Sequence, residues 1–144
     1  MIQRESTLSD RGHVFIVDLD AESIATVREL LEGDGYSVDS SVGGDTAVDG
    51  IASAEPNLVL LDAHLKDVDP FELLERLKQT QQGRDIPVIF MTTPEDSEAR
   101  GRALEAGDDL IVKPIDSREV LARIERQVTV STVRMALRES EAKF

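Results

Sequence analysis

The chain has 144 residues, a formal net charge of −13 and no cysteine. The length fits one domain, and the lack of cysteine excludes disulfides and thiolate metal sites. Nucleic-acid binding by this segment is not expected, because phosphate contacts need clustered Lys and Arg. The sequence has no apolar run long enough to cross a membrane and no apolar signal segment near its start. We therefore expect a cytoplasmic protein with no membrane partner.

Hydrophobic periodicity divides the first half of the chain into alternating strands and helices. Short aliphatic runs predict strands buried on both faces, and apolar residues at helical spacing predict helices between them. The most apolar run, Leu-Val-Leu-Leu, ends on Asp62. After a polar lead-in (1–12), we expect strand 14–17, helix 21–32, strand 36–42, helix 43–54 and strand 57–62.

Helix-start signals organise the second half of the chain. Asp69-Pro70 puts an acid at the cap and proline at the first helical position, and Thr93-Pro94 has a similar pattern. Asp116 stands three residues before Glu119, which is the spacing of a capping box. The remaining expected elements are a helix from 70 to near 83, strand 86–91, a helix from 94 to 107, strand 110–112 and a helix from 117 through 128.

Five strand–helix units in strict alternation predict an α/β fold, with a parallel sheet covered by helices on both faces. For this length we expect a flavodoxin-like, doubly wound sheet with strand order 2-1-3-4-5. In that order the carboxyl ends of the first, third, fourth and fifth strands are neighbours at one edge. These ends carry Asp18, Asp62, Thr92 and Lys113, which we expect to share one cleft.

The expected cleft has the groups that phosphoryl transfer needs. Adjacent strands lie about 5 Å apart, so Asp18 and Asp62 would repel each other by roughly 3–4 kcal/mol at an effective dielectric near 20. Lys113 or a hard divalent cation, Mg²⁺ for preference, could offset that repulsion. Asp62 would then be the nucleophile, and Thr92 would donate a hydrogen bond to a phosphoryl oxygen.

Four motifs together carry a resemblance to a known family. They are Asp18 at the end of the first strand, Leu-Val-Leu-Leu-Asp62, Pro-Val-Ile-Phe-Met-Thr92, and Ala-Leu-Glu-Ala-Gly107 ahead of Lys113. Their order and spacing resemble the receiver domain of bacterial two-component response regulators. The resemblance covers roughly residues 13–128.

The resemblance implies a signalling domain rather than an enzyme. Asp62 would accept a phosphoryl group from a histidine kinase or a phosphotransfer protein. Thr92 and Lys113 would form the pair that senses the phosphoryl group, and the peptide bond before Pro114 would be cis. Mg²⁺ would be bound by Asp18, Asp62 and the backbone carbonyl of His64, whose side chain we expect to face solvent.

The chain departs from the family pattern at the metal site. The family usually has two adjacent acids after the first strand, and here Leu19 stands at the second position. Asp20 could bind the metal after a rearrangement of the backbone, or it could cap the following helix. Because even the loss of a group that supports a ligand lowers metal affinity about 10–100-fold, we expect weak Mg²⁺ binding. The alternative function is a pseudo-receiver, an interaction module of the same fold with a disabled site.

A second departure concerns the position of Leu110, where many members of the family carry a tyrosine that reorients on phosphorylation. A more distant alternative is a phosphatase, because Asp18-Leu19-Asp20 resembles the Asp-x-Asp of haloacid-dehalogenase-type enzymes. In that family the lysine precedes a Gly-Asp motif, whereas here Lys113 follows such a motif. Asp62 would also have no role in such an enzyme.

Residues 129–144 extend beyond the last helix that a receiver needs. Val130, Val133 and Leu137 have an apolar spacing that Phe144 continues, but its register differs from that of the preceding stripe. A break in the helix or a stutter in its apolar register near Thr129 is therefore plausible. The final residues resemble a linker to a PAS domain, so we expect a helix that leads to a further output domain. This helix would pair with a second copy, or else fold onto its own domain.

Overall fold

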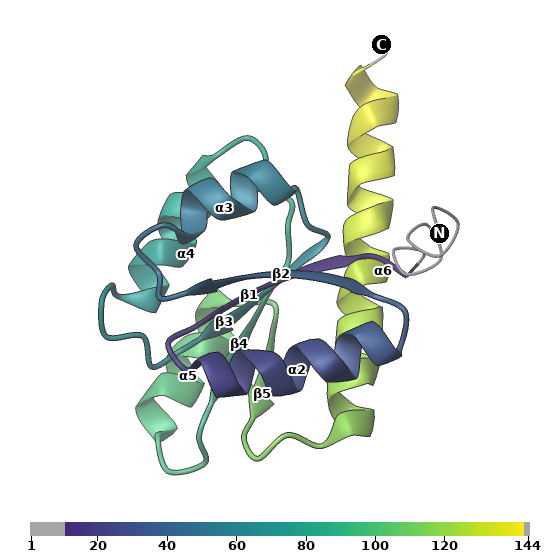
Figure 1. Cartoon of the computed structure of the whole chain (residues 1–144). Coiled ribbons are helices and arrows are strands. Elements are labelled where there is room, and N and C mark those ends of the chain that lie inside the picture. Colours follow the sequence, from purple (N-terminus) through teal and green to yellow (C-terminus); the bar gives the residue numbers. More distant parts are fainter. Residues whose placement is uncertain (1–10, 143–144) are drawn as a thin grey trace.

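The computed structural model describes residues 11–142, so most of the lead-in and the position of Phe144 lie outside the described residues. Its centre is a five-stranded parallel sheet with the order β2-β1-β3-β4-β5, which confirms the predicted topology (Figure 1). The strands are β1 (His13–Asp18), β2 (Ser37–Val42), β3 (Leu58–Asp62), β4 (Val88–Thr92) and β5 (Asp109–Val112).

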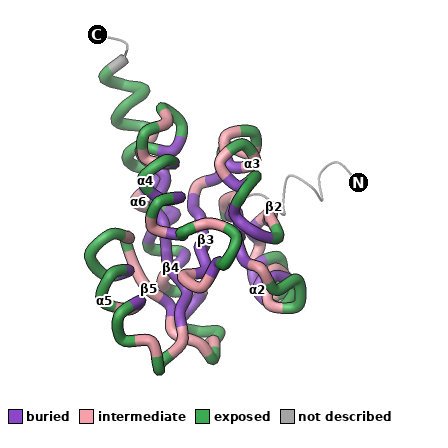
Figure 2. Tube along the Cα trace, turned by 90° about the vertical axis from the view of Figure 1, so that its left-hand side faces the viewer, coloured by how far each residue is buried: buried purple, intermediate pink, exposed green. Residues whose placement is uncertain are grey.

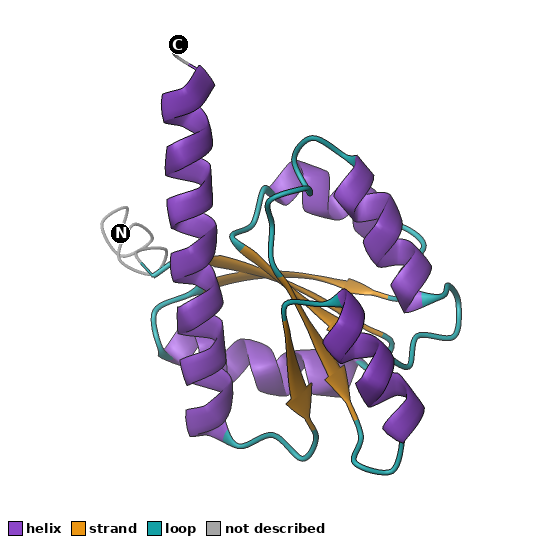
Figure 3. Cartoon of the chain, turned by 180° about the vertical axis from the view of Figure 1, so that it is seen from behind, coloured by secondary structure: helices purple, strands orange, loops and turns teal. Residues whose placement is uncertain are grey.

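Helices cover both faces of this sheet (Figure 3). One group of buried side chains joins the sheet to α2 and α6, and a second joins it to α3, α4 and α5. No helix within residues 11–142 is both long and apolar enough to cross a membrane. The helices are α2 (Ala21–Gly33), α3 (Ala47–Ala54), α4 (Pro70–Gln79), α5 (Ser97–Ala106) and α6 (Ser117–Ala142).

The central strands are buried on both faces, as their aliphatic runs predict. Every residue of β3 and β4 is buried, and purple tube marks buried segments in the interior of Figure 2. Side chains of β1 alternate between the two cores: Val14 and Ile16 pack toward α2 and α6, and Phe15 and Val17 pack toward the other three helices. This alternation fixes which of the two cores each residue of β1 faces.

Aspartates cap α4 and α5, two of the helices that begin at the carboxyl edge of the sheet. Asp69 accepts a hydrogen bond from the Phe71 N–H at 2.9 Å, with Pro70 at the first helical position, as predicted. The expected start of α5 at Thr93-Pro94 is wrong by several residues. Asp96 is the cap instead, and it accepts from the Ala99 N–H at 2.9 Å.

The last helix is continuous, which excludes the first of the two possibilities near Thr129, a break. The change in apolar register has another cause: the first half of α6 packs with the α2-side core, whereas Met135 packs against the core of the opposite face. The hydroxyls of Thr129 and Thr132 donate to carbonyls four residues earlier, a bond that threonine can make within a helix.

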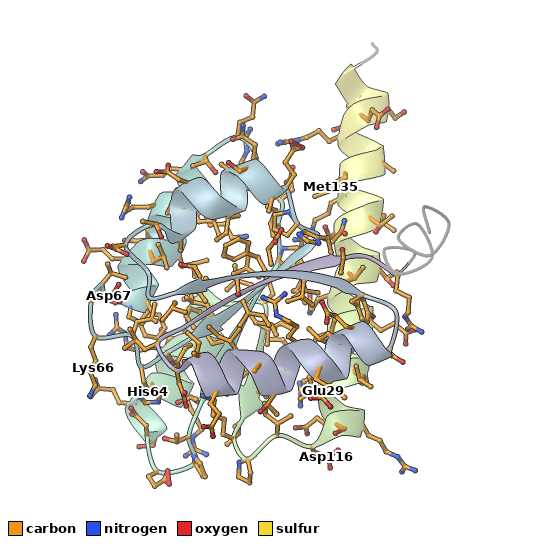
Figure 4. The ribbon with its side chains drawn as sticks, in the orientation of Figure 1. Glu29, His64, Lys66, Asp67, Asp116 and Met135 are labelled. Carbon is orange, nitrogen blue, oxygen red and sulfur yellow. The ribbon has the colours of Figure 1, made fainter. Side chains whose placement is uncertain are left out.

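Beyond Val128, one face of α6 still touches its own domain. Ser131 is fully buried, Met135 is partly buried, and Arg138 Nη1 pairs with Asp85 Oδ2 at 2.8 Å. Figure 4 shows Met135 on α6. The opposite face carries Val133 and Leu137, which are 61% and 59% exposed. The tail therefore combines contact with its own domain and an uncovered apolar stripe.

Candidate functional site

The sheet places four predicted residues at one edge. Val17 of β1 pairs in register with Leu61 of β3, so Asp18 and Asp62 are the next residues of neighbouring strands. Thr92 ends β4, where it pairs with Val112 of β5. Lys113 follows directly, and its N–H donates to the Thr92 carbonyl at 2.8 Å. The acids, the hydroxyl and the amine thus come from four adjacent strands.

The carboxylates at this edge are removed from water. Asp18 is 2% exposed and Asp62 is 6% exposed. Burial raises the pKa of Asp62 above its ordinary value, and the negative charge of Asp18 raises it further; the His64 N–H and Lys113 act in the opposite direction. The site therefore holds a carboxylate whose charge is poorly compensated.

The contacts of Asp18 leave one oxygen open. Its Oδ1 accepts a hydrogen bond from the Asp20 N–H at 3.0 Å. Within the described part of the chain its buried Oδ2 has no hydrogen-bond donor, although Lys113 Nζ lies 3.6 Å away as an ion-pair partner. A buried carboxylate oxygen without a donor is costly, and a bound cation would satisfy it.

Asp20 does not join this pair. Of the two roles left open by the sequence, the structure shows the cap: Asp20 Oδ1 accepts from the Glu22 N–H at 3.0 Å, at the start of α2. Within residues 11–142, no group of three or more His, Asp or Glu side chains is placed to hold a metal ion together. With Asp20 in its capping conformation, a cation here would depend on Asp18, Asp62 and backbone or water oxygens.

The side chain of His64 does not simply face solvent. The backbone N–H of His64 donates to Asp62 Oδ1 at 3.1 Å, so the chain after β3 folds back toward this carboxylate. Its ring Nε2 lies 3.0 Å from Thr92 Oγ1, and its Nδ1 lies 3.6 Å from Asp96 Oδ2. Figure 4 shows His64 in the loop beside α5. The sequence carries no signal for these ring contacts, because they depend on the path of the loop after β3.

The two family departures are also visible. Leu19 is partly buried and packs against the core of the α3, α4 and α5 face, and Leu110 packs there as well. Neither side chain has a polar group for the site. The Lys113–Pro114 peptide bond is cis, as the resemblance implies.

A doubly wound 2-1-3-4-5 sheet with paired acids, a threonine and a lysine at its carboxyl edge defines the receiver class of two-component signalling. The family model of the response regulator receiver domain matches residues 14–125, and the chain belongs to this family. Receiver domains act as phosphoacceptor modules in signal transduction. The phosphatase interpretation is not retained, because Asp20 caps α2 and the family is a different one.

Curated relatives include transcriptional regulators. The chain is 36% identical over 136 residues to the transcriptional regulatory protein YkoG of Bacillus subtilis, covering 93% of this chain and 54% of that protein. It is 36% identical over 108 residues to the phosphate regulon transcriptional regulatory protein PhoB of Escherichia coli, covering 72% and 47%. The chain thus spans about half the length of the curated relatives that it matches.

Solved receiver structures share the fold. The signal receiver domain of a histidine kinase from Syntrophus aciditrophicus is 28% identical, with a TM-score of 0.74 over 82% of this chain and 90% of that one. The receiver domain of the sensor histidine kinase PA1611 from Pseudomonas aeruginosa is 22% identical, with a TM-score of 0.75 over 82% and 98%. That structure has a magnesium ion in its active-site cleft.

Proposed function

We propose that Asp62 accepts a phosphoryl group from the phosphohistidine of a histidine kinase or a phosphotransfer protein. The observation that carries this proposal is the placement of Asp62. It is a nearly buried carboxylate at the end of β3, beside Asp18, with Thr92 and Lys113 on the strands to its other side.

In this reaction a carboxylate oxygen of Asp62 bonds to phosphorus while the phosphorus–nitrogen bond of the donor breaks. The leaving imidazole nitrogen takes up a proton from solvent, and the product is an acyl phosphate. Lys113 offsets the charge of the transferred group, and Thr92 supplies a hydrogen-bond donor to one of its oxygens. The His64 N–H already holds one oxygen of Asp62, which orients the carboxylate.

The residues present fit a divalent cation, with fewer ligands than the family usually provides. Asp18, Asp62 and the His64 carbonyl would hold Mg²⁺, and the cation would neutralise charge on the phosphoryl oxygens. The open Oδ2 of Asp18 supports this assignment, and Mg²⁺ commonly keeps several waters while it binds one or two carboxylates. Because Leu19 offers no oxygen, we propose that the affinity is weak.

We propose further that the receiver controls an output domain beyond residue 128. The matched region is only about half the length of the curated relatives, which include transcriptional regulators. Segment 129–144 would be the helical linker, of a kind found before PAS domains. Its exposed Val133 and Leu137 would pair with a second copy of the chain.

The proposed phosphorylation is tested by intact-mass spectrometry after incubation with Mg²⁺ and acetyl phosphate. The expected result is a single phosphoryl adduct on the wild-type chain and none on Asp62→Ala. Asp69→Ala is a matched control, because Asp69 is an exposed aspartate that only caps α4, and it should be labelled like the wild type. An equal adduct on the Asp62→Ala variant would contradict the proposal.

Leu19 favours a second candidate function, a pseudo-receiver that binds partners without being phosphorylated. This function would leave the mass unchanged in the same experiment. It would also give no heat and no amide shifts on titration with Mg²⁺. A phosphoryl adduct on Asp62 excludes it.

A further inference from the structure

The ring of His64 connects two residues that belong to different elements. Nε2 lies 3.0 Å from the hydroxyl of Thr92 at the end of β4, and Nδ1 lies 3.6 Å from Oδ2 of Asp96 ahead of α5. Thr92 is fully buried, and the His64 and Asp96 side chains are 36% and 38% exposed. We refer to these three side chains as the Thr92–His64–Asp96 bridge.

Asp96 is bound to α5 by its other oxygen. Its Oδ1 accepts from the Ala99 N–H at 2.9 Å, and its carbonyl accepts from the Arg100 N–H at 3.1 Å. A displacement of the Asp96 carboxylate therefore changes the cap of α5, where the first orphan N–H groups of the helix are satisfied. The bridge links the buried hydroxyl of the site to the start of this helix.

The hydroxyl of Thr92 can donate its proton either to His64 or to another acceptor, but not to both. A threonine hydroxyl has a single proton, and an imidazole with its proton on Nδ1 has a free acceptor at Nε2. That tautomer matches both neighbours, because Nδ1–H faces the Asp96 carboxylate and Nε2 accepts from Thr92. While Thr92 donates to His64, its proton is not available to a phosphoryl oxygen.

We propose that His64 is a positioning residue that competes with the phosphoryl group for the hydroxyl of Thr92 and transmits the outcome to α5 through Asp96. This inference rests on the proposed phosphorylation of Asp62. When Thr92 turns its proton to the phosphoryl group, His64 loses one of its two side-chain partners and Asp96 loses the restraint on Oδ2. The first turn of α5 then changes without an aromatic residue at the position of Leu110, which has no polar group to take part.

The resting bridge is tested first, in the full chain and without phosphoryl donor. The amide of Ala99 is followed by nitrogen–proton NMR in the wild type, His64→Ala and Lys66→Ala. Lys66 is an exposed residue of the same loop and serves as the control (Figure 4). His64→Ala should shift the Ala99 resonance and speed its hydrogen exchange at least twofold, and Lys66→Ala should change neither. An unchanged Ala99 amide in His64→Ala would overturn the bridge.

The competition is tested by titration with beryllium trifluoride and Mg²⁺, which together mimic a bound phosphoryl group. His64→Ala should bind the mimic at least threefold more tightly than the wild type. The same substitution in a Thr92→Val background should leave the affinity unchanged, since no hydroxyl remains to compete for. His64→Gln, whose amide oxygen can accept from Thr92, should restore the wild-type affinity. Equal gains in both backgrounds would overturn the competition.

Transmission to α5 is tested separately, by the effect of the phosphoryl mimic on the Ala99 amide resonance. In the wild type the mimic should shift the Ala99 amide, and in Asp96→Asn, which keeps a capping oxygen but lacks the negative charge, this shift should fall by at least half. A full shift in Asp96→Asn would overturn transmission through Asp96. If the mimic binds neither the wild type nor His64→Ala, the proposed function fails and the competition fails with it. The Ala99 comparison without the mimic still decides whether the bridge exists.

Discussion

Asp62 combines the proposed phosphoacceptor role with a cost to the fold. Its carboxylate is 6% exposed beside the buried Asp18, and both burial and this neighbour raise its pKa. A buried acid with a raised pKa destabilises the native state wherever it is ionised, because the unfolded chain solvates the charge better. Sites of this kind commonly trade stability for function.

Replacement of Asp62 with asparagine should therefore stabilise the metal-free protein. We expect Asp62→Asn to raise the free energy of unfolding at pH 7 by about 1 kcal/mol, a usual size for relief of a strained functional site. Between the unfolded pKa of 3.8 and the raised folded pKa, the native state binds more protons than the unfolded state. The gain should thus be complete above the folded pKa and disappear as the pH falls toward 3.8.

Urea denaturation at several pH values, with EDTA present, measures this effect. Asp116→Asn is the control, since Asp116 is an exposed capping acid outside the site and asparagine also caps helices well. A gain of equal size at pH 3.5 and pH 7 would contradict the electrostatic explanation.

The position of Leu19 makes a second prediction. Leu19→Asp adds a carboxylate directly after Asp18, where the family usually has one, and should tighten Mg²⁺ binding at least about 10-fold. Leu19→Asn has nearly the same shape without the charge and should give a much smaller gain. Calorimetric titration of Mg²⁺ into the three proteins measures the affinities. Equal affinities for the Asp and Asn variants would show that charge at this position is irrelevant.

The residues of the candidate site differ in how far the sequence could predict them. Asp18, Asp62 and Thr92 each end a strand and Lys113 directly follows one, so the topology alone brings them to one edge. The ring of His64 was misplaced because its position follows from the loop after β3, where the His64 N–H turns back to Asp62. Asp20 remained undecided because one carboxylate can serve a cap or a metal, and only the backbone geometry selects the cap.

At the scale of elements, the strands were more predictable than the helix boundaries. Runs such as 58–61 have no plausible position except between two helical layers, so their burial follows from composition. The expected start of α5 was wrong because Thr93-Pro94 and Asp96 are both acceptable signals for the start of a helix. The Asp96 side chain reaches the Ala99 N–H, and that hydrogen bond decides the boundary.

The path of the tail was left open from the sequence, because a change of apolar register accompanies either a break in a helix or a stutter within it. In the structure one helix contacts two cores in succession: Ile124 and Val128 pack on the α2 side, and Met135 packs on the other. Sequence periodicity shows that the partner changes along the helix. It does not show whether the backbone breaks there.

The ion pair between Asp85 and Arg138 should hold the second half of α6 to the domain. A double-mutant cycle with Asp85→Ala and Arg138→Ala should give a coupling free energy of about 0.2–1 kcal/mol, as is usual for partly exposed pairs. The Asp85 side chain is 24% exposed and that of Arg138 is 43% exposed. Urea denaturation measures the cycle. A coupling that persists unchanged in 1 M salt would argue against an ion pair, because salt screens such charges.

At the scale of the whole molecule, the uncovered stripe of α6 predicts self-association. Val133 and Leu137 lie one turn apart and are more than half exposed (Figure 2 shows the outer turns of α6 in green). Val133→Glu with Leu137→Glu should shift the chain toward the monomer and raise the dimer dissociation constant at least tenfold. Light scattering over a range of concentrations measures it, and Glu139→Gln on the same helix is the control. A wild-type chain that stays monomeric at millimolar concentration would refute the pairing.

The continuity of α6 also fixes the direction in which its exposed apolar stripe points around the helix axis. Each helical residue turns the chain by about 100° and advances it by about 1.5 Å, so the azimuth of the Val133–Leu137 stripe is set by the number of residues that separate it from the core. One residue inserted after Thr132 would swing the stripe to a different side of the molecule, and seven would bring it back to within about 20° of its original direction. A signal passed along this helix to the proposed output domain would depend on the phase of the helix, and a series of insertions should alter that output periodically rather than in proportion to length.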